Sequence, residues 1–348
     1  MPKNIIILSD GTGQEGGEGN NTNIYKLFNM LVDRTPGQMV FYDRGVGTGA
    51  RKYLGMITGL GFSKNVQDGY RFIFDHYEAG DRVFLFGFSR GAATVRSLSS
   101  FIHYFGILPQ SRPELITKAY KIYKIKNDAR RKCKADEFIA KHHTMWIRVK
   151  FMGCYDTVAA LGLPIPFLCG VLDRIPLFWH RFHDFRLSEC VEHAYHALAI
   201  DDQRKVFHPV LWDVEKFPHQ SVKQVWFCGM HTDVGGGYKE QTLSDIPLEW
   251  MVDMAKQHGL KIYPKNKVPI QADVNGIMHD SRGTWLSKIY TQQQRSWDAG
   301  RPDKPIIHES VFKRTKNINN TDEPPYLPWI KTIDHEVETG GSSETENQ

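Results

Sequence analysis

A Gly-x-Ser-x-Gly pentapeptide, Gly87 to Gly91, places Ser89 where it could supply a nucleophilic hydroxyl. An apolar run from Arg82 to Phe86 precedes it, and a segment with helical character follows from Ala92. Strand, tight turn and helix in this order are typical of a nucleophile elbow, in which the serine hydroxyl projects above a sheet. The two glycines remove the Cβ atoms that would clash in so sharp a turn. The pattern predicts Ser89 as a catalytic nucleophile, and an ordinary strand–loop–helix turn is the alternative.

A serine nucleophile needs a base to take its proton and an acid to orient that base. Asp156 directly follows the apolar run Ile147–Cys154, and His231 follows the run Val222–Gly229. The order Ser, Asp, His along the chain is that of α/β-hydrolases. We therefore expect Asp156 to be the acid and His231 the base.

Each of these two assignments has an alternative. Asp233 is a second candidate for the acid, or a group that binds the glycine-rich loop after His231. His308 follows a short apolar run near the end of the chain and is a second candidate for the base. Because the chain has 15 histidines, any single one is more often structural than catalytic.

An oxyanion hole needs two backbone N–H groups that point at the developing negative charge. The residue after the nucleophile, Arg90, supplies one of them in an elbow. The loop after the first apolar run, with Gly11 and Thr12, is the expected source of the second. Asp10 either fixes this loop through its carboxylate or forms a simple Asx turn.

The same loop contains a literal G-x-G-x-x-G, Gly11 to Gly16, which is the best argument for a dinucleotide-binding protein. The third glycine should lie in the first turn of a helix, yet loop-forming residues continue to Asn21. The expected acidic residue would have to be Asp43, which comes too late. The chain also lacks a G-x-x-x-x-G-K-[ST] motif, and its five cysteines are scattered without C-x-x-C spacing. We expect no cofactor, no metal and reduced thiols.

Apolar runs alternate with helix-like stretches along the chain. This alternation predicts an α/β fold of the α/β-hydrolase type, with a mostly parallel central sheet and helices on both faces. Residues 1–330 should form a single domain, and residues 334–348, which are polar and rich in Gly, Ser and Glu, a disordered tail. The expected strands are Asn4–Ser9, Met39–Tyr42, Arg82–Phe86, Ile147–Cys154 and Val222–Gly229, and the expected helices are Asn23–Asp33, Lys64–Glu78, Ala92–Phe105 and Leu187–Leu198.

Two segments are candidates for a lid or an excursion from the core. Residues 118–145 carry many of the basic side chains and form a solvated helical face or a surface for an anionic partner. Residues 163–186 are rich in Pro, Phe, Trp and Leu and form a lid or a packed loop. The net charge of +5 is mild, and without a recognisable binding module we expect no nucleic-acid partner. No run of 18 apolar residues or secretory signal is present, so we expect synthesis in the cytoplasm.

The chain resembles the α/β-hydrolase family that includes the type VI secretion phospholipase effectors of the first class and their bacterial and fungal relatives. Seven motifs in the same order carry the resemblance, over roughly residues 3 to 315: Ser9–Thr12 with Asn21–Asn23, Tyr42–Thr48, Gly87–Ala92, Tyr155–Val158, His196–Arg204, His231–Tyr238 and the block around His308.

The resemblance implies a serine esterase or lipase with a lipid ester as its substrate. It implies that Ser89 is the nucleophile, and it favours Asp156 as the acid and His231 as the base. It leaves His308 as the alternative base. It also implies peripheral contact with a membrane surface, export without a signal peptide, and an immunity protein as a possible partner. A function of another class, a non-catalytic hydrolase-fold protein that holds a ligand, is the alternative.

Overall fold

The computed structural model describes residues 2–11, 17, 20–45, 60–158, 186–213, 217–264, 270–285, 287–322 and 324–340. Their centre is one sheet of eight strands in the order β2-β1-β3-β4-β5-β6-β7-β8, and every neighbouring pair is parallel. Because all strands run the same way, their carboxyl ends meet at one edge of the sheet, where ligands bind in folds of this class. The strands are β1 (Asn4–Ser9), β2 (Gln38–Asp43), β3 (Arg82–Phe88), β4 (Val149–Tyr155), β5 (Val191–Ala199), β6 (Ser221–Phe227), β7 (Ile306–His308) and β8 (Glu336–Glu338).

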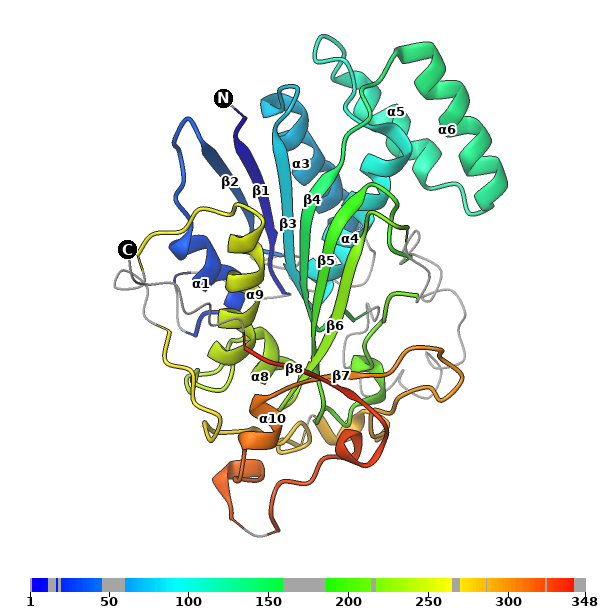
Figure 1. Cartoon of the computed structure of the whole chain (residues 1–348). Helices are drawn as coiled ribbons and strands as arrows, with labels where there is room; N and C mark the ends of the chain where they lie inside the picture. The colour runs from blue at the N-terminus through cyan, green and yellow to red at the C-terminus, as the bar shows by residue number, and fades with distance from the viewer. Residues whose placement is uncertain are drawn as a thin grey trace.

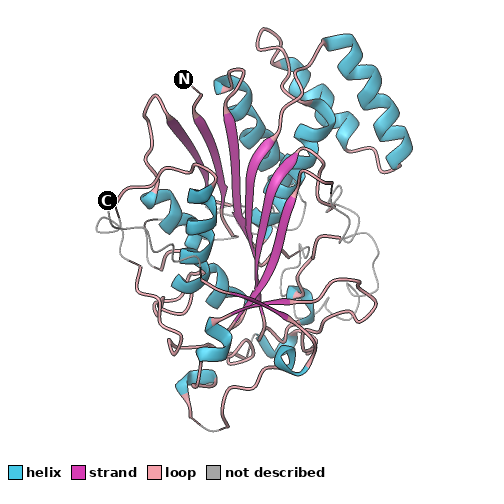
Figure 2. Cartoon of the chain, in the orientation of Figure 1, coloured by secondary structure: helices cyan, strands magenta, loops and turns pink. Residues whose placement is uncertain are grey.

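Helices cover both faces of the sheet (Figures 1 and 2). Side chains alternate along a strand, so one strand serves two cores. In β1, Ile5 and Ile7 pack in the cluster that includes α3 (Leu60–His76) and α4 (Arg90–Phe105). Ile6 and Leu8 pack in the other cluster, with α1 (Asn23–Met30) and α9 (Asp245–Gln257). The predicted α/β class, with a parallel sheet covered on both faces, is confirmed. The remaining helices are α5 (Glu114–Tyr123), α6 (Asp128–His142), α8 (His231–Gly235), α10 (Ser310–Lys313) and the 3₁₀ turns Lys205–Phe207, Ser287–Ile289, Ile318–Asn320 and Trp329–Thr332.

The helix expected over Leu187–Leu198 is wrong, because this stretch contains the central strand β5. Alanine, glutamate and histidine give it a helical appearance, but it hydrogen-bonds to β4 on one side and β6 on the other. All six residues from Ala194 to Ala199 are buried between the helical layers. Tertiary pairing has overridden a weak local preference, as is common for strands.

Of the two candidate lid or excursion segments, the structure describes the first. The segment 118–145 belongs to α5 and α6, an excursion packed on α4 at the end of the sheet where the strands begin (Figure 1). It does not cover Ser89, which lies at the opposite end. Of the segment 163–186, only residue 186 lies within the described residues.

The predicted tail is wrong for its first residues, because Glu336–Glu338 form the edge strand β8. Glu338 accepts hydrogen bonds from Nζ of Lys223 at 2.7 Å and from Nε1 of Trp250 at 3.3 Å. Polar composition therefore does not prevent pairing here, since the side chains are held by partners on the sheet. Residues 341–348 lie outside the described part of the chain. Within that part, no helix has the length and apolar character needed to cross a bilayer.

Candidate active site

Ser89 stands on a strained turn between β3 and α4. Its backbone has φ = 58° and ψ = −119°, a left-handed conformation that costs energy for a residue with a side chain. The flanking glycines are sterically required, because a Cβ on Gly87 would lie 2.4 Å from the carbonyl oxygen of Gly91. A Cβ on Gly91 would lie 2.0 Å from the carbonyl oxygen of Ser9. The pentapeptide therefore forms the sharp elbow that its sequence predicts, and the hydroxyl of Ser89 stands at the carboxyl edge of the sheet.

The three predicted triad side chains form a continuous hydrogen-bonded relay. Oγ of Ser89 lies 2.8 Å from Nε2 of His231, and Nδ1 of His231 lies 2.6 Å from Oδ2 of Asp156. An ionised carboxylate can only accept, so Nδ1 carries the proton and Nε2 has a free lone pair for the serine hydroxyl. This tautomer is the one in which the imidazole can act as a base towards Ser89.

The rings of Phe88 and Phe207 enclose the imidazole of His231, with centroid distances of 4.7 and 5.0 Å. His231 begins the short helix α8 directly after β6, and its side chain is 5% exposed. The imidazole is thus held between aromatic faces and largely shielded from water.

Asp156 sits in a tight turn at the end of β4, with φ = 39°. The next residue, Thr157, donates its backbone N–H to Nε2 of His196 at 3.0 Å. Burial lowers the pKa of His196 to about 3, which keeps this ring neutral and able to accept. The turn that carries Asp156 is therefore held by a histidine that takes no proton near neutral pH.

Arg295 is a site residue that sequence reasoning missed. Its Nη1 and Nη2 donate to Oδ1 and Oδ2 of Asp156 at 2.7 and 2.8 Å, so the pair is bidentate. Burial alone would raise the pKa of Asp156, but the charge and hydrogen bonds of Arg295 outweigh it and hold that pKa well below its usual range. The sequence around Arg295 is polar and contains no motif, so nothing local distinguishes it from a surface arginine.

The segment Ala199 to Arg204, whose role the sequence left open, holds the loops of the relay in place. Ala199 donates its N–H to Oδ1 of Asp156 at 3.0 Å, and Asp202 accepts the N–H of His231 at 3.2 Å. Asp201 accepts the N–H of Gly229 at 2.7 Å, just before His231. Arg204 forms an ion pair with Asp202 at 2.6 Å. The backbone carries both carboxylates on one turn, and only that of Asp202 reaches Arg204.

The two alternative residues, Asp233 and His308, lie away from Ser89. Asp233 accepts hydrogen bonds from the backbone N–H of Met230 at 3.1 Å and from His279, whose Nδ1 lies 2.6 Å away, so it binds the loop around α8. His308, at the end of β7, stacks on Phe227 with a centroid distance of 4.7 Å. The structure does not bring either of them to Ser89.

The predicted oxyanion donors differ in whether their backbone N–H is free to bind a substrate oxygen. Arg90 is the first residue of α4, where backbone N–H groups have no acceptor within the helix. The N–H of Gly11 already donates to Oδ1 of Asp10 at 2.6 Å, which corrects its assignment as a free donor. Asp10 also accepts the hydroxyl protons of Thr22 and Tyr42, and burial raises its pKa to about 6. Asp10 therefore fixes this loop through its carboxylate. Thr12 lies outside the described residues.

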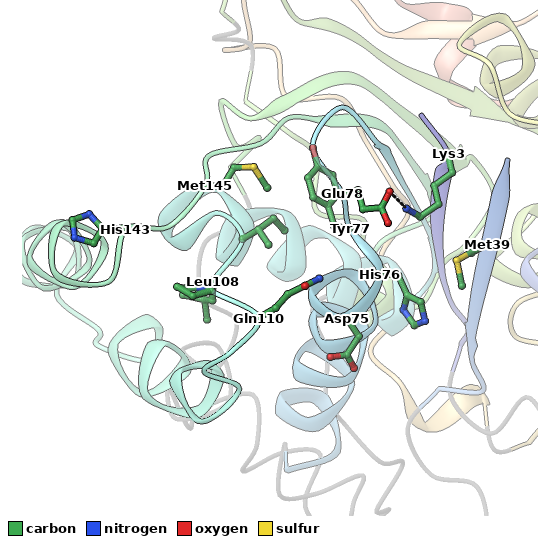
Figure 3. Close-up of a pocket in the computed structure, with 12 residues that line it drawn as sticks. Lys3, Met39, Asp75, His76, Tyr77, Glu78, Leu108, Gln110, His143 and Met145 are labelled. Carbon is green, nitrogen blue, oxygen red and sulfur yellow. Dashed lines mark ion pairs between the residues drawn. The ribbon is translucent and has the colours of Figure 1, made fainter. Parts of the chain in front are cut away.

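A cavity of about 550 Å³ opens at the other end of the sheet, where the strands begin (Figure 3). Lys3, His76, Gln110 and Met145 are among its lining residues, and Lys3 forms an ion pair with Glu78. None of the three relay residues lines it. The relay at the carboxyl edge is therefore a separate feature and the better candidate for catalysis.

One comparison with known proteins identifies the family of the chain. The family model described as "T6SS, Phospholipase effector Tle1-like, catalytic domain" matches residues 3–254. The uncharacterized protein YEL023C of Saccharomyces cerevisiae is 27% identical over 230 residues, which are 59% of this chain and 32% of that protein. The chain thus spans about a third of the length of this yeast relative.

Two solved structures are more distant. An uncharacterized protein from Pseudomonas aeruginosa is 16% identical with a TM-score of 0.49, over 78% of this chain and 47% of the other. A Tle1 effector bound to the VgrG spike of the type VI secretion system is 14% identical with a TM-score of 0.45, over 86% and 82% of the two chains.

Proposed function

The chain belongs to the family of Tle1-like phospholipase effector catalytic domains, and on this premise we propose that it is a serine hydrolase of carboxylic esters. The observation that carries the proposal is the unbroken relay from Ser89 through His231 to Asp156, with both hydrogen bonds at 2.8 Å or less. The relay needs no cofactor.

In this mechanism Oγ of Ser89 attacks the ester carbonyl while Nε2 of His231 takes its proton. Asp156 orients the imidazole and stabilises its charged form. The N–H of Arg90, at the start of α4, donates to the negative oxygen of the tetrahedral intermediate. His231 then gives its proton to the leaving alcohol, and an acyl group remains on Ser89. Water attacks this acyl-enzyme with His231 again as the base, which releases the acid and restores the serine.

The surroundings of the base favour an ester with a large apolar part. Phe207, in contact with His231, also packs against Tyr290 with a centroid distance of 5.9 Å. Trp285, only five residues before Tyr290, exposes 73% of its surface. Phe207 and Tyr290 thus form an aromatic surface beside His231, and a short distance away along the chain stands an exposed tryptophan, a residue suited to the boundary between water and lipid. We propose a lipid ester, and within the family a phospholipid, as the substrate.

We also propose a partner and a route of export, both from the family of the chain. The family model and one structural neighbour are named for type VI secretion, so export without a signal peptide and neutralisation by an immunity protein are the expectations to test. Co-purification of this chain with the product of a neighbouring gene would test the immunity partner.

The test of the function compares the wild-type protein with Ser89→Ala on short- and long-chain p-nitrophenyl esters and on phospholipid vesicles. Hydrolysis of lipid that disappears in the variant supports the proposal, whereas hydrolysis of short esters alone reduces it to a soluble esterase. A folded wild-type protein that hydrolyses none of these and does not react with a fluorophosphonate contradicts it. Such a result would leave the ligand-binding alternative.

A further inference from the structure

A buried arginine faces the acid of the relay. Arg295 and Asp156 are 2% and 0% exposed. The carboxylate accepts four hydrogen bonds: two from Arg295, one from the N–H of Ala199 and one from Nδ1 of His231. Arg295 also donates to the carbonyl oxygens of Ala199 and Phe207. The guanidinium thus links the carboxylate of Asp156 to the backbone at Ala199 and at Phe207.

The loop that carries Arg295 is itself fixed to the segment after β5. Gln293 donates its N–H to the carbonyl oxygen of Gln203 at 2.8 Å, and Lys205 donates its N–H to that of Thr291 at 2.9 Å. Nε2 of His208 lies 2.9 Å from the carbonyl oxygen of Gln293. These bonds hold the backbone on the N-terminal side of Arg295, so its position is built into the fold.

We propose that Arg295 is a positioning residue of the proton relay: it fixes both oxygens of Asp156 and cancels the carboxylate charge, so that the buried assembly of Arg295, Asp156 and His231 is neutral between turnovers. The inference rests on the proposed function. It adds a residue that lies beyond residue 254, where the match to the family model ends.

The cancelled charge has a direct consequence for proton uptake. Without Arg295, a proton taken up by Asp156 and His231 would change their net charge from −1 to 0. With Arg295, the same proton changes the net charge of the three side chains together from 0 to +1, which burial disfavours. This charge difference is the same whether Asp156 or His231 binds the proton, because the two titrate as a coupled pair. Arg295 therefore keeps His231 able to accept the proton of Ser89 at lower pH than an Asp–His pair alone would.

Other charged groups near the relay are accounted for by their own partners. Asp202 is paired with Arg204, and the neutral His196 binds Thr157. Asp201 accepts the hydroxyl proton of Tyr326 at 2.8 Å, and burial raises its pKa to about 6. Arg96, which acts on His196, is buried and binds the carbonyl oxygen of Val210. Because the pKa of Asp201 lies near the acidic side of the expected pH profile, Arg295→Met is also tested in a protein that carries Asp201→Asn.

The test measures kcat/KM for a short ester against pH in wild type, Arg295→Met and Arg295→Lys. The acidic limb is the part of the profile in which kcat/KM falls as the pH decreases. In Arg295→Met the midpoint of this limb should move up by about one to two pH units, as expected for the loss of a positive charge near the base. In Arg295→Lys the charge remains, so the limb should stay within about half a unit of wild type. Its kcat should fall about tenfold, because an ammonium group lacks the fork that binds two oxygens. A folded Arg295→Met variant with the wild-type acidic limb would overturn the proposal.

Arg131→Met is the matched control. Arg131, in α6 at the opposite end of the sheet, is 2% exposed and binds the carbonyl oxygen of Ile125, so its loss should lower stability without moving the acidic limb. The shift caused by Arg295→Met should persist in the Asp201→Asn background, and its disappearance there would assign it to Asp201. If Arg295→Met does not fold, Arg295→Lys decides, because an unchanged kcat contradicts positioning by the fork.

NMR titration of His231 in the Ser89→Ala background separates this proposal from the proposed function. The titration of His231 should move up with Arg295→Met even where no catalysis is measured. A wild-type protein without hydrolysis but with this shift would contradict the function and support the role of Arg295. Hydrolysis without the shift would contradict the role of Arg295 alone.

Discussion

The ring of Phe88, the residue before the nucleophile, packs against the imidazole of His231 with a centroid distance of 4.7 Å. The same ring leaves no room at Gly235, at the end of α8, where a Cβ would lie 2.0 Å from Cε2 of Phe88. The last residue of β3 therefore lies against both ends of α8. Through this contact, the strand that presents Ser89 also sets the position of the helix that carries His231.

Gly235→Ala should consequently impair both stability and catalysis. The methyl group must displace Phe88 or α8, and overpacking of this kind costs about 1–3 kcal/mol. Movement of α8 would also lengthen the bond between His231 and Ser89, so kcat should fall at least about tenfold. Urea denaturation and ester hydrolysis measure the two effects. Gly283→Ala is the control, because its nearest heavy atom would be 3.3 Å away. A Gly235→Ala protein with wild-type stability and kcat would show that the contact does not position the base.

The two candidate bases should behave differently on substitution. His231→Gln removes the lone pair that faces Ser89, so kcat/KM should fall by about a thousandfold or more. His308→Gln should keep kcat within about threefold of wild type, because His308 contacts Phe227 and Ser310 rather than Ser89. Rates of p-nitrophenyl ester hydrolysis distinguish the two. A larger loss in His308→Gln than in His231→Gln would reverse the assignment of the base.

The residues that could be predicted from sequence are those whose neighbours along the chain define their environment. Ser89, Asp156 and His231 each follow an apolar run, and parallel strands bring their carboxyl ends to one edge. Arg295 follows no such run, and its partner Asp156 is 139 residues away. Its role depends on a long-range pairing that no local pattern encodes.

Strand β5 illustrates the same limit at the level of secondary structure. Its alanines and histidines carry no strand signal of their own, and it forms because its backbone pairs with β4 on one side and β6 on the other. Strand β8 forms at the sheet edge although its sequence is charged, since Lys223 and Trp250 bind Glu338. In both elements the deciding partners are remote in sequence.

His308 should make the protein sensitive to acid. Burial lowers its pKa from 6.5 to about 4, so between these values the unfolded chain binds a proton that the folded protein does not. Stability is then fully present above about pH 6.5 and falls as the pH drops towards 4, by up to about 3 kcal/mol. The free energy of unfolding of His308→Gln should therefore decline less than that of wild type over this range. Urea denaturation at several pH values measures this, with the exposed His219→Gln as control. A difference between wild type and His308→Gln that does not change with pH would exclude the effect.

Trp285 should contribute to activity on lipid surfaces and not to the chemical step. It is 73% exposed and lies close in sequence to Tyr290, which packs on Phe207 beside the base. Trp285→Ala should lower the rate of vesicle hydrolysis about three- to tenfold, since an exposed tryptophan favours insertion at the lipid boundary, and leave short soluble esters unaffected.

Trp146→Ala is the matched control for this prediction. Trp146 is 53% exposed but precedes β4, at the end of the sheet away from Ser89 (Figure 1). Its loss should leave both rates unchanged if lipid reaches the enzyme at the carboxyl edge. Equal losses in the two variants would indicate that membrane contact involves both ends of the molecule. A loss in Trp146→Ala alone would place that contact at the end with α5 and α6, and a lipid substrate would then have to reach Ser89 from the opposite side.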